Sequence, residues 1–236
     1  MLSIIIPTHN EENYLPKLLK CIKKQDHKDY EIIVGDSFST DKTIKIARNY
    51  GCRIIKDLVQ SGGPARGRNS GAKKARGEML LFLDADSMID ASFISTALKE
   101  MKERSLDVAG IFIDPIGNKS ADKFLLGTFN FWIFITQFIT PHAVGSGIFC
   151  KKWLHDKIKG FDESIRVAED MDYVRRAGKH GKFRVLNKVR LNFSMRRFDN
   201  EGRIAVMLKN FFGALHRIFI GEIRSDILKY NLRYKK

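Results

Sequence analysis

The stretch LLFLDADSMID, residues 80–90, gives the clearest indication of the fold and of its chemistry. Four apolar residues, typical of a buried strand, run directly into Asp84 and Asp86, which are separated by one small residue. Alternate residues of a strand lie on the same face, so the two carboxylates would repel each other unless a positive charge lay between them. A divalent cation held by oxygen ligands would supply that charge, and a solvated turn without an ion is the alternative.

Short β-rich runs alternate with helical patterns on both sides of this stretch, as far as Ile113. The β-rich runs are LSIII, YEIIVG, RIIK, MLLFL and DVAGIFI, and a helical pattern follows each of the first four. This alternation predicts an α/β fold with a mostly parallel sheet, in which ligands bind beyond the carboxyl ends of the strands. Residues 7–11, 35–37 and 84–86 would then lie along one edge of the sheet.

Helical patterns dominate the second half of the chain. Residues 119–140 predict an aromatic-rich helix or a pair of helices, and residues 168–181 predict a charged helix. From Arg203 onward, the apolar residues recur at the spacing of an amphipathic helix. They include Ile204, Leu208, Phe211, Phe212, Leu215 and Phe219. With Lys209, Arg217 and Arg224 beside it, this stripe suits the headgroup plane of an anionic membrane, and packing on the core or on a second subunit is the alternative.

The positive charge is unevenly distributed. The net charge is +15, and residues 177–236 alone carry 15 Lys and Arg against 4 Asp and Glu. Such an excess indicates a polyanionic partner, either a membrane or a nucleic acid. The three cysteines lie far apart, no signal peptide is evident, and the longest apolar stretch, residues 124–139, is shorter than the roughly 20 residues of a spanning helix. We therefore expect a cytoplasmic protein, free or peripheral on the cytoplasmic face of the membrane.

Several other polar side chains suit chemistry on a nucleotide. Asp36 could accept the ring N–H of a nucleobase or could cap a turn. Arg68 lies in a glycine-rich segment at a predicted helix start, which suits a diphosphate but also a basic loop. Asp170 could act as a general base or could simply favour the positive end of its helix. Arg196 and Arg197 could bind phosphate or form a solvated basic turn.

Five segments occur in a characteristic order along the chain. They are SIIIPTHNEENYLPKLLKCI, EIIVGDSFSTDKTIKIA, GPARGRNSGAKKARGEMLLFLDADS, GFDESIRVAEDMDYVRRAGKHGK and FSMRRF. Together they resemble the motifs of the family-2 inverting glycosyltransferases of GT-A fold. The resemblance implies a Rossmann-like, mostly parallel sheet flanked by helices. It implies a catalytic domain of residues 1–202, with a nucleotide-binding half at about 1–115 and an acceptor half at about 116–202. The resemblance ends there, and we expect C-terminal amphipathic helices in a basic region of residues 203–236 from the apolar spacing and the charge alone.

The resemblance implies roles for residues on the donor side of the site. Pro7, Thr8 and Glu11 would border the nucleoside, and Asp36 would bind its base. Arg68 would lie near the diphosphate. Because uracil and guanine both present a ring N–H, the donor could be a UDP-linked or a GDP-linked sugar.

The resemblance also implies which residues carry the reaction. Asp84 and Asp86 would bind Mg²⁺ or Mn²⁺, and Asp170 matches the position of the catalytic base. Arg196 and Arg197 would close over phosphate. The acceptor would be a hydroxyl group or a lipid phosphate, and a nucleic acid is not expected as partner.

Two departures from related families narrow the prediction. The Gln-x-x-Arg-Trp element of processive synthases is absent, so repeated polymerisation is not expected. Met88 stands where some dolichyl-phosphate mannose synthase-like members offer the metal a polar residue. Two other classes remain as alternatives: a nucleotidyltransferase, which would share the acidic edge and the metal, and a non-catalytic nucleic-acid-binding protein, which would explain the charge.

Overall fold

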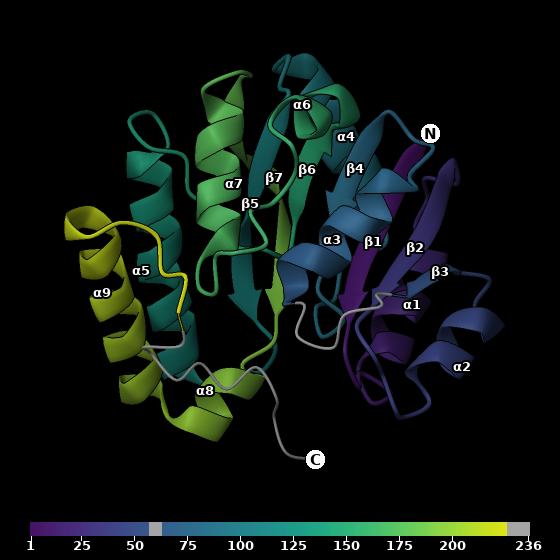
Figure 1. Cartoon of the computed structure of the whole chain (residues 1–236), viewed down its shortest axis with the longest axis horizontal. Helices are drawn as coiled ribbons and strands as arrows, with labels where there is room; N and C mark the ends of the chain where they lie inside the picture. Colours follow the sequence, from purple (N-terminus) through teal and green to yellow (C-terminus); the bar gives the residue numbers. More distant parts are fainter. Residues whose placement is uncertain (57–62, 226–236) are drawn as a thin grey trace.

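Seven strands form one central sheet in the computed structural model, which describes residues 1–56 and 63–225. Their order across the sheet is β3-β2-β1-β4-β6-β5-β7 (Figure 1). The strands are β1 (Leu2–Thr8), β2 (Tyr30–Asp36), β3 (Arg53–Lys56), β4 (Met79–Phe82), β5 (Val108–Pro115), β6 (Ile148–Lys151) and β7 (Phe183–Phe193). β6 runs antiparallel to β4 and β5, whereas the other neighbouring strands are parallel. The predicted mostly parallel α/β sheet is confirmed.

Helices cover both faces of the sheet. They are α1 (Leu15–Lys23), α2 (Thr43–Asn49), α3 (Pro64–Lys73), α4 (Phe93–Glu103), α5 (Ser120–Thr136), α6 (Lys152–Lys157), α7 (Glu169–Gly178), α8 (Arg196–Glu201) and α9 (Arg203–Phe219). In β1, Ile4 and Ile6 join an apolar cluster with α1 and α4, whereas Ile5 joins a second cluster with α3, α6 and α7. Alternation of side chains along a strand produces these two clusters, and burial of both explains why three isoleucines follow one another in β1.

Helix α3 packs unusually close to the sheet because glycines line the contact. A Cβ atom added to Gly35 of β2 would lie 2.2 Å from the carbonyl oxygen of Gly67, and one added to Gly71 would lie 2.6 Å from Ile5. Both distances are shorter than any real carbon contact, so larger side chains do not fit at these positions. The glycines of this segment thus bring the first turn of α3, with Arg68, against the carboxyl ends of β1 and β2.

The second half of the chain adds strands that the sequence did not predict. β6 has only four residues, and β7 mixes buried and exposed positions around a register shift opposite Ile111 and Phe112. Neither therefore shows the uniform apolar run of the first strands. Residues 119–140 contain one helix, α5, rather than a pair, and the charged helix predicted over residues 168–181 is α7.

The C-terminal part continues from the sheet through α8 into α9. The predicted division at residue 202 falls on Gly202, whose φ of +85° allows the chain to turn between these helices. A separate region of residues 203–236 stays a prediction, and its last residues, 226–236, lie outside the described part. Each helix within the described residues is too short or too polar to span a bilayer.

Candidate functional site

The carboxyl ends of β1, β2 and β4 meet at one edge of the sheet. Thr8 and Asp36, the last residues of β1 and β2, lie opposite each other in the parallel register. The turn with Asp84 and Asp86 follows β4, which is the other neighbour of β1. The main chains of Met88 and Asn192 exchange hydrogen bonds of 3.0 and 2.9 Å, which join this turn to the end of β7. The topology therefore collects residues from distant parts of the chain at a single edge.

Asp36, the last residue of β2, lies at this edge of the sheet and is almost fully buried. Its Oδ1 accepts hydrogen bonds from the hydroxyls of Thr8 (2.8 Å) and Ser39 (2.5 Å), and its Oδ2 accepts one from the Ser39 backbone N–H (3.0 Å). A carboxylate oxygen that accepts one hydrogen bond can accept a second. The contacts thus fix the orientation of Asp36, and its binding to a nucleobase stays a prediction.

Arg68 lies beneath the acidic turn, with 2% of the residue exposed. Its Nη2 contacts Asp84 Oδ1 at 2.8 Å and its Nη1 contacts Glu169 Oε1 at 2.7 Å. Its guanidinium also lies 5.3 Å from the ring centroid of Phe161. Burial alone would lower the pKa of Arg68, but Asp84 and Glu169 hold that pKa above its ordinary value. The guanidinium therefore links β4 to α7, and its contact with a diphosphate stays a prediction.

The start of α7 brings Glu169 and Asp170 to the same cluster. The residue before them, Ala168, has a φ of +61°, a left-handed conformation that residues other than glycine rarely adopt. Burial and the charge of Glu169 raise the pKa of the Asp170 carboxyl, Arg68 lowers it, and together they bring this pKa to about 7. A carboxylate with such a pKa exchanges protons near neutral pH, as a general base requires.

Arg196 covers the acidic turn from the side of β7. Its guanidinium bonds both carboxylate oxygens of Glu11, at 3.0 and 3.1 Å, and lies 3.2 Å from Asp86 Oδ2. It also stacks over the ring of Tyr14, 4.5 Å from the centroid. Burial raises the pKa of Glu11 in spite of this partner. In this structure Arg196 therefore contacts carboxylates, and its contact with phosphate stays a prediction.

Pro7 contacts α3, and Arg197 contacts another residue of α8. Pro7 packs against α3, as the short distance of 3.1 Å between its Cβ atom and a Cβ atom added to Gly67 shows. The Arg197 guanidinium lies 3.2 Å from Glu201, one turn along α8. Arg197 thus contacts its own helix, unlike Arg196, and the predicted roles of Pro7 and Arg197 toward the donor stay predictions.

The charge of the cluster fits a divalent cation. Five carboxylates (those of Glu11, Asp84, Asp86, Glu169 and Asp170) face the guanidinium groups of Arg68 and Arg196, which leaves three negative charges in excess when all are ionised. Burial raises the pKa of Asp86, and the adjacent Asp84 charge adds to this against Arg196. Within residues 1–56 and 63–225, no group of three or more His, Cys, Asp or Glu side chains could hold a metal ion. An ion at Asp84 and Asp86 would thus need ligands from substrate and water, as is usual for Mg²⁺.

Sequence reasoning missed several residues that shape this cluster. The sequence assigns no role to Glu169, although it is one of the two carboxylates that Arg68 contacts. Ser146 and Ser87 support the acidic turn: the Ser146 hydroxyl accepts the Asp84 N–H at 3.0 Å and donates to the Ser87 hydroxyl at 3.0 Å. Tyr14 lies under Arg196. A serine or tyrosine without a motif offers no signal for such roles, whereas the Glu169–Asp170 pair could have been assigned together.

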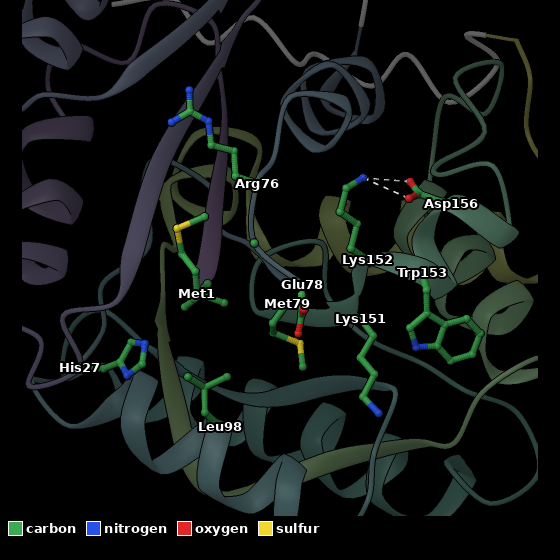
Figure 2. Close-up of a pocket in the computed structure, with 12 residues that line it drawn as sticks. Met1, His27, Arg76, Glu78, Met79, Leu98, Lys151, Lys152, Trp153 and Asp156 are labelled. Atoms are coloured by element: carbon green, nitrogen blue, oxygen red, sulfur yellow. Dashed lines mark hydrogen bonds and ion pairs between the residues drawn. The ribbon is translucent and has the colours of Figure 1, made fainter.

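A separate cavity of 740 Å³ lies at the other end of the sheet (Figure 2). Leu2 and Met79, which begin β1 and β4, line it, together with Trp153 and the ion pair between Lys152 and Asp156, 3.1 Å apart. The described residues around it include none of the predicted site residues. In a parallel sheet the functional edge is the carboxyl one, so this cavity is not the candidate site.

Comparison with known proteins places this geometry among sugar transferases. Residues 3–158 match the family model described as "Glycosyl transferase family 2". The poly(ribitol-phosphate) beta-N-acetylglucosaminyltransferase TarS of Staphylococcus aureus (strain Mu50 / ATCC 700699) is 37% identical over 112 residues, which are 45% of this chain and 20% of that protein. The crystal structure of S. aureus TarS 1–349 in complex with UDP-GlcNAc superposes with a TM-score of 0.68 at 22% identity, over 99% of this chain and 76% of that one.

Two further proteins resemble the chain. The GalNAc(5)-diNAcBac-PP-undecaprenol beta-1,3-glucosyltransferase of Campylobacter jejuni subsp. jejuni serotype O:2 (strain ATCC 700819 / NCTC 11168) is 37% identical over 127 residues, 51% of this chain and 41% of that protein. The mannosyltransferase PcManGT from Pyrobaculum calidifontis, in complex with GDP-Man and Mn²⁺, superposes with a TM-score of 0.71 at 20% identity, over 92% and 64% of the two chains. The structural similarities confirm the GT-A fold, and the chain spans less than half the length of the two curated relatives.

Proposed function

The chain belongs to glycosyl transferase family 2, and we propose that it transfers a sugar from a nucleoside-diphosphate sugar to an acceptor with inversion at the anomeric carbon. The observation that carries this proposal is the cluster of carboxylates that Arg68 holds together at the carboxyl edge of the sheet. The edge is where ligands bind in open α/β sheets. The family match also speaks against the two alternatives raised from the sequence, a nucleotidyltransferase and a nucleic-acid-binding protein.

Asp84 and Asp86 are the residues that would hold a divalent cation in this proposal. When bound, Mg²⁺ or Mn²⁺ stabilises the negative charge that develops on the departing diphosphate. The excess negative charge of the cluster supports such an ion, and the Mn²⁺ in the complex of PcManGT supports it by analogy. The ion pair with Arg68 fixes the position of the Asp84 carboxylate before the donor binds.

Asp170 would remove the proton from the acceptor hydroxyl. The acceptor oxygen attacks the anomeric carbon from the face opposite the diphosphate, its proton passes to Asp170, and the bond between that carbon and the diphosphate oxygen breaks. Attack from the opposite face inverts the configuration. The raised pKa of Asp170 supports a hydroxyl acceptor, because a lipid phosphate is already ionised near neutral pH and needs no base.

The donor and the acceptor are proposed by chemical class. The buried carboxylate of Asp36 supports a base with a ring N–H, and both UDP-GlcNAc and GDP-Man occur in complexes of structural neighbours. The C. jejuni relative is named for a lipid-linked saccharide, GalNAc(5)-diNAcBac-PP-undecaprenol. We therefore propose a UDP-linked or GDP-linked donor and an acceptor hydroxyl that a lipid can carry.

The proposal is tested by titrating the protein with UDP and with GDP in a calorimeter, with Mn²⁺ and with a chelator. We expect one nucleotide to bind at least about tenfold more tightly with Mn²⁺, and Asp84→Asn and Asp86→Asn to remove that difference. Asp156→Asn, at the far cavity, is the matched control and should bind like the wild type. Binding of both nucleotides without regard to metal or to these substitutions would contradict the proposal.

A further inference from the structure

We propose that α5 and α9 together form an apolar surface that docks on an anionic phospholipid bilayer. The surface is defined by the exposed apolar side chains of the two helices. On α5 they are Phe124, Phe131, Trp132, Phe134 and Ile135, and on α9 they are Ile204, Met207, Leu208, Phe211, Phe212, Ile218 and Phe219. Monomeric proteins rarely leave so many large apolar side chains in contact with water without a partner.

Helix α9 turns its large apolar side chains away from the protein. Its buried residues are Val206 and Gly213, which are small enough to let the helix lie on the core. Phe211 and Phe219, in contrast, are 57% and 80% exposed. The apolar stripe that the sequence predicted is therefore not the face that packs on the core, which was the main alternative to a membrane.

Helix α5 repeats this arrangement. Its buried residues are Asp122, Leu126 and Ile133. Phe124, Phe131 and Ile135 follow one another at intervals of seven and four residues, so they lie along one side of the helix. Phe124 is 75% exposed.

The two helices are connected at their first turns. Arg203 of α9 binds both carboxylate oxygens of Asp122 in α5, at 2.6 and 2.8 Å. Leu126 of α5 and Val206 of α9 belong to the same buried cluster. Figure 1 shows α9 running alongside α5 at the edge of the molecule beyond β7. The two apolar faces thus belong to one corner of the fold.

The charge around this corner selects a lipid surface over a second copy of the chain. The described residues 119–139 and 203–225, which contain the two helices and their ends, carry six Lys and Arg against two Asp and Glu, so two copies that met through this region would repel each other. Anionic headgroups would instead attract it, and aromatic side chains with basic flanks are typical of helices that lie in the headgroup plane. Protein interfaces, by comparison, are depleted in lysine.

The surface borders the edge of the sheet that carries the candidate site. α5 follows β5, and α9 follows α8, which begins at Arg196. Docking through α5 and α9 would thus bring the site close to an acceptor that is anchored in the same bilayer. The inference goes beyond the proposed transferase function, and its test measures binding without any sugar transfer.

Vesicle flotation of the full chain tests the proposal. The vesicles contain phosphatidylglycerol with phosphatidylcholine, or phosphatidylcholine alone, each in low and in high salt. The variants are a double change on α9, Phe211→Gln with Phe219→Gln, and one on α5, Phe124→Gln with Phe131→Gln. Trp153→Gln is the matched control, because Trp153 is 49% exposed but lies at the far cavity.

We expect the wild type and Trp153→Gln to float with anionic vesicles in low salt, less in high salt, and each double variant to lose at least about tenfold in partitioning. Because all four phenylalanines are exposed, circular dichroism should show an unchanged fold. Failure of the wild type to float, or flotation of the double variants like the wild type, would overturn the proposal. The proposal would also be overturned if the wild type did not bind vesicles but formed a dimer, and the double variants were monomers. The surface would then belong to a second copy of the chain.

Discussion

Two arginines bridge pairs of carboxylates on opposite sides of the candidate site, and their surroundings differ. Arg68 forms the floor, with its side chain 3% exposed between Asp84 and Glu169. Arg196 forms the cover, with its side chain 21% exposed between Glu11 and Asp86. The same pairing chemistry therefore occurs once in the interior and once at the surface.

The difference indicates two different uses of one residue type. A buried guanidinium cannot leave its carboxylates without stranding charges in the interior, so Arg68 acts as a fixed part of the scaffold. A partly exposed guanidinium such as that of Arg196 can exchange its carboxylates for a phosphate at a small cost in free energy, because water screens the carboxylates that it leaves. We infer that the floor orders the carboxylates and that the cover responds to the donor.

The largest expected effect concerns Asp170, beside the floor. We expect Asp170→Asn to lower turnover by about 10²–10⁴-fold with donor affinity nearly unchanged, because the amide cannot take the acceptor proton. Steady-state kinetics with a hydroxyl acceptor measures this. A near-native rate would mean that Asp170 is not the general base.

The same residue predicts a pH dependence. The pKa of Asp170 is raised from 3.8 to about 7, so between these values the folded protein binds a proton that the unfolded chain releases. The contribution of Asp170 to the free energy of unfolding therefore falls as the pH rises through this range. Asp170→Asn should raise the melting temperature relative to the wild type at pH above 7 but not at pH below 4, and wild-type turnover should fall below a pH of about 7.

The next effect compares the two arginines directly. Arg68→Met should lower the free energy of unfolding by about 3 kcal/mol, the lower end for a buried ion pair, because the largely buried Glu169 and the partly exposed Asp84 lose their partner. Arg196→Met should lower it by only about 1 kcal/mol and should instead weaken nucleotide binding. Urea unfolding of the ligand-free proteins measures both losses. Equal losses would show that floor and cover do not differ in the way inferred here.

A smaller effect tests how rigidly the floor is packed. A Cβ atom on Gly145 would lie 2.5 Å from Arg68 Nη2, and two ion pairs prevent that group from moving away freely. Gly145→Ala should therefore lower the free energy of unfolding by about 1–3 kcal/mol. In Gly127→Ala, the matched control on α5, the new methyl group meets nothing within 4 Å, and the change should stabilise the helix by up to about 1 kcal/mol. If Gly145→Ala proved as mild as its control, the floor would be looser than the contacts indicate.

The first half of the fold could be read from the sequence because its central strands contain short apolar runs buried on both faces, and the partly exposed edge strand β3 still has two adjacent isoleucines. LLFL before Asp84 is the clearest instance, and the position of polar residues after such runs follows from the topology of a parallel sheet. β6 and β7 could not be read in this way, since one is very short and the other alternates irregularly.

The pairing of charges could not be predicted at all. Arg68 meets Glu169 across 101 residues, and Arg196 meets Glu11 across 185 residues. Neither separation leaves a local pattern, because the contacts depend on how the sheet is assembled rather than on spacing along the chain. The motifs indicate which charged residues belong to the site, but only the fold shows which of them form ion pairs with one another.

The antiparallel strand β6 has a consequence for how the protein is made. β4 pairs with β1 on one side and with β6, residues 148–151, on the other. While the chain emerges from the ribosome, the apolar segment Leu80–Phe82 therefore remains an unpaired sheet edge until β6 has been synthesised. Such edges recruit strands from other molecules, so fragments that end before Ile148 should aggregate through β4. The middle of the sheet can therefore be completed only after the antiparallel strand β6 has been synthesised.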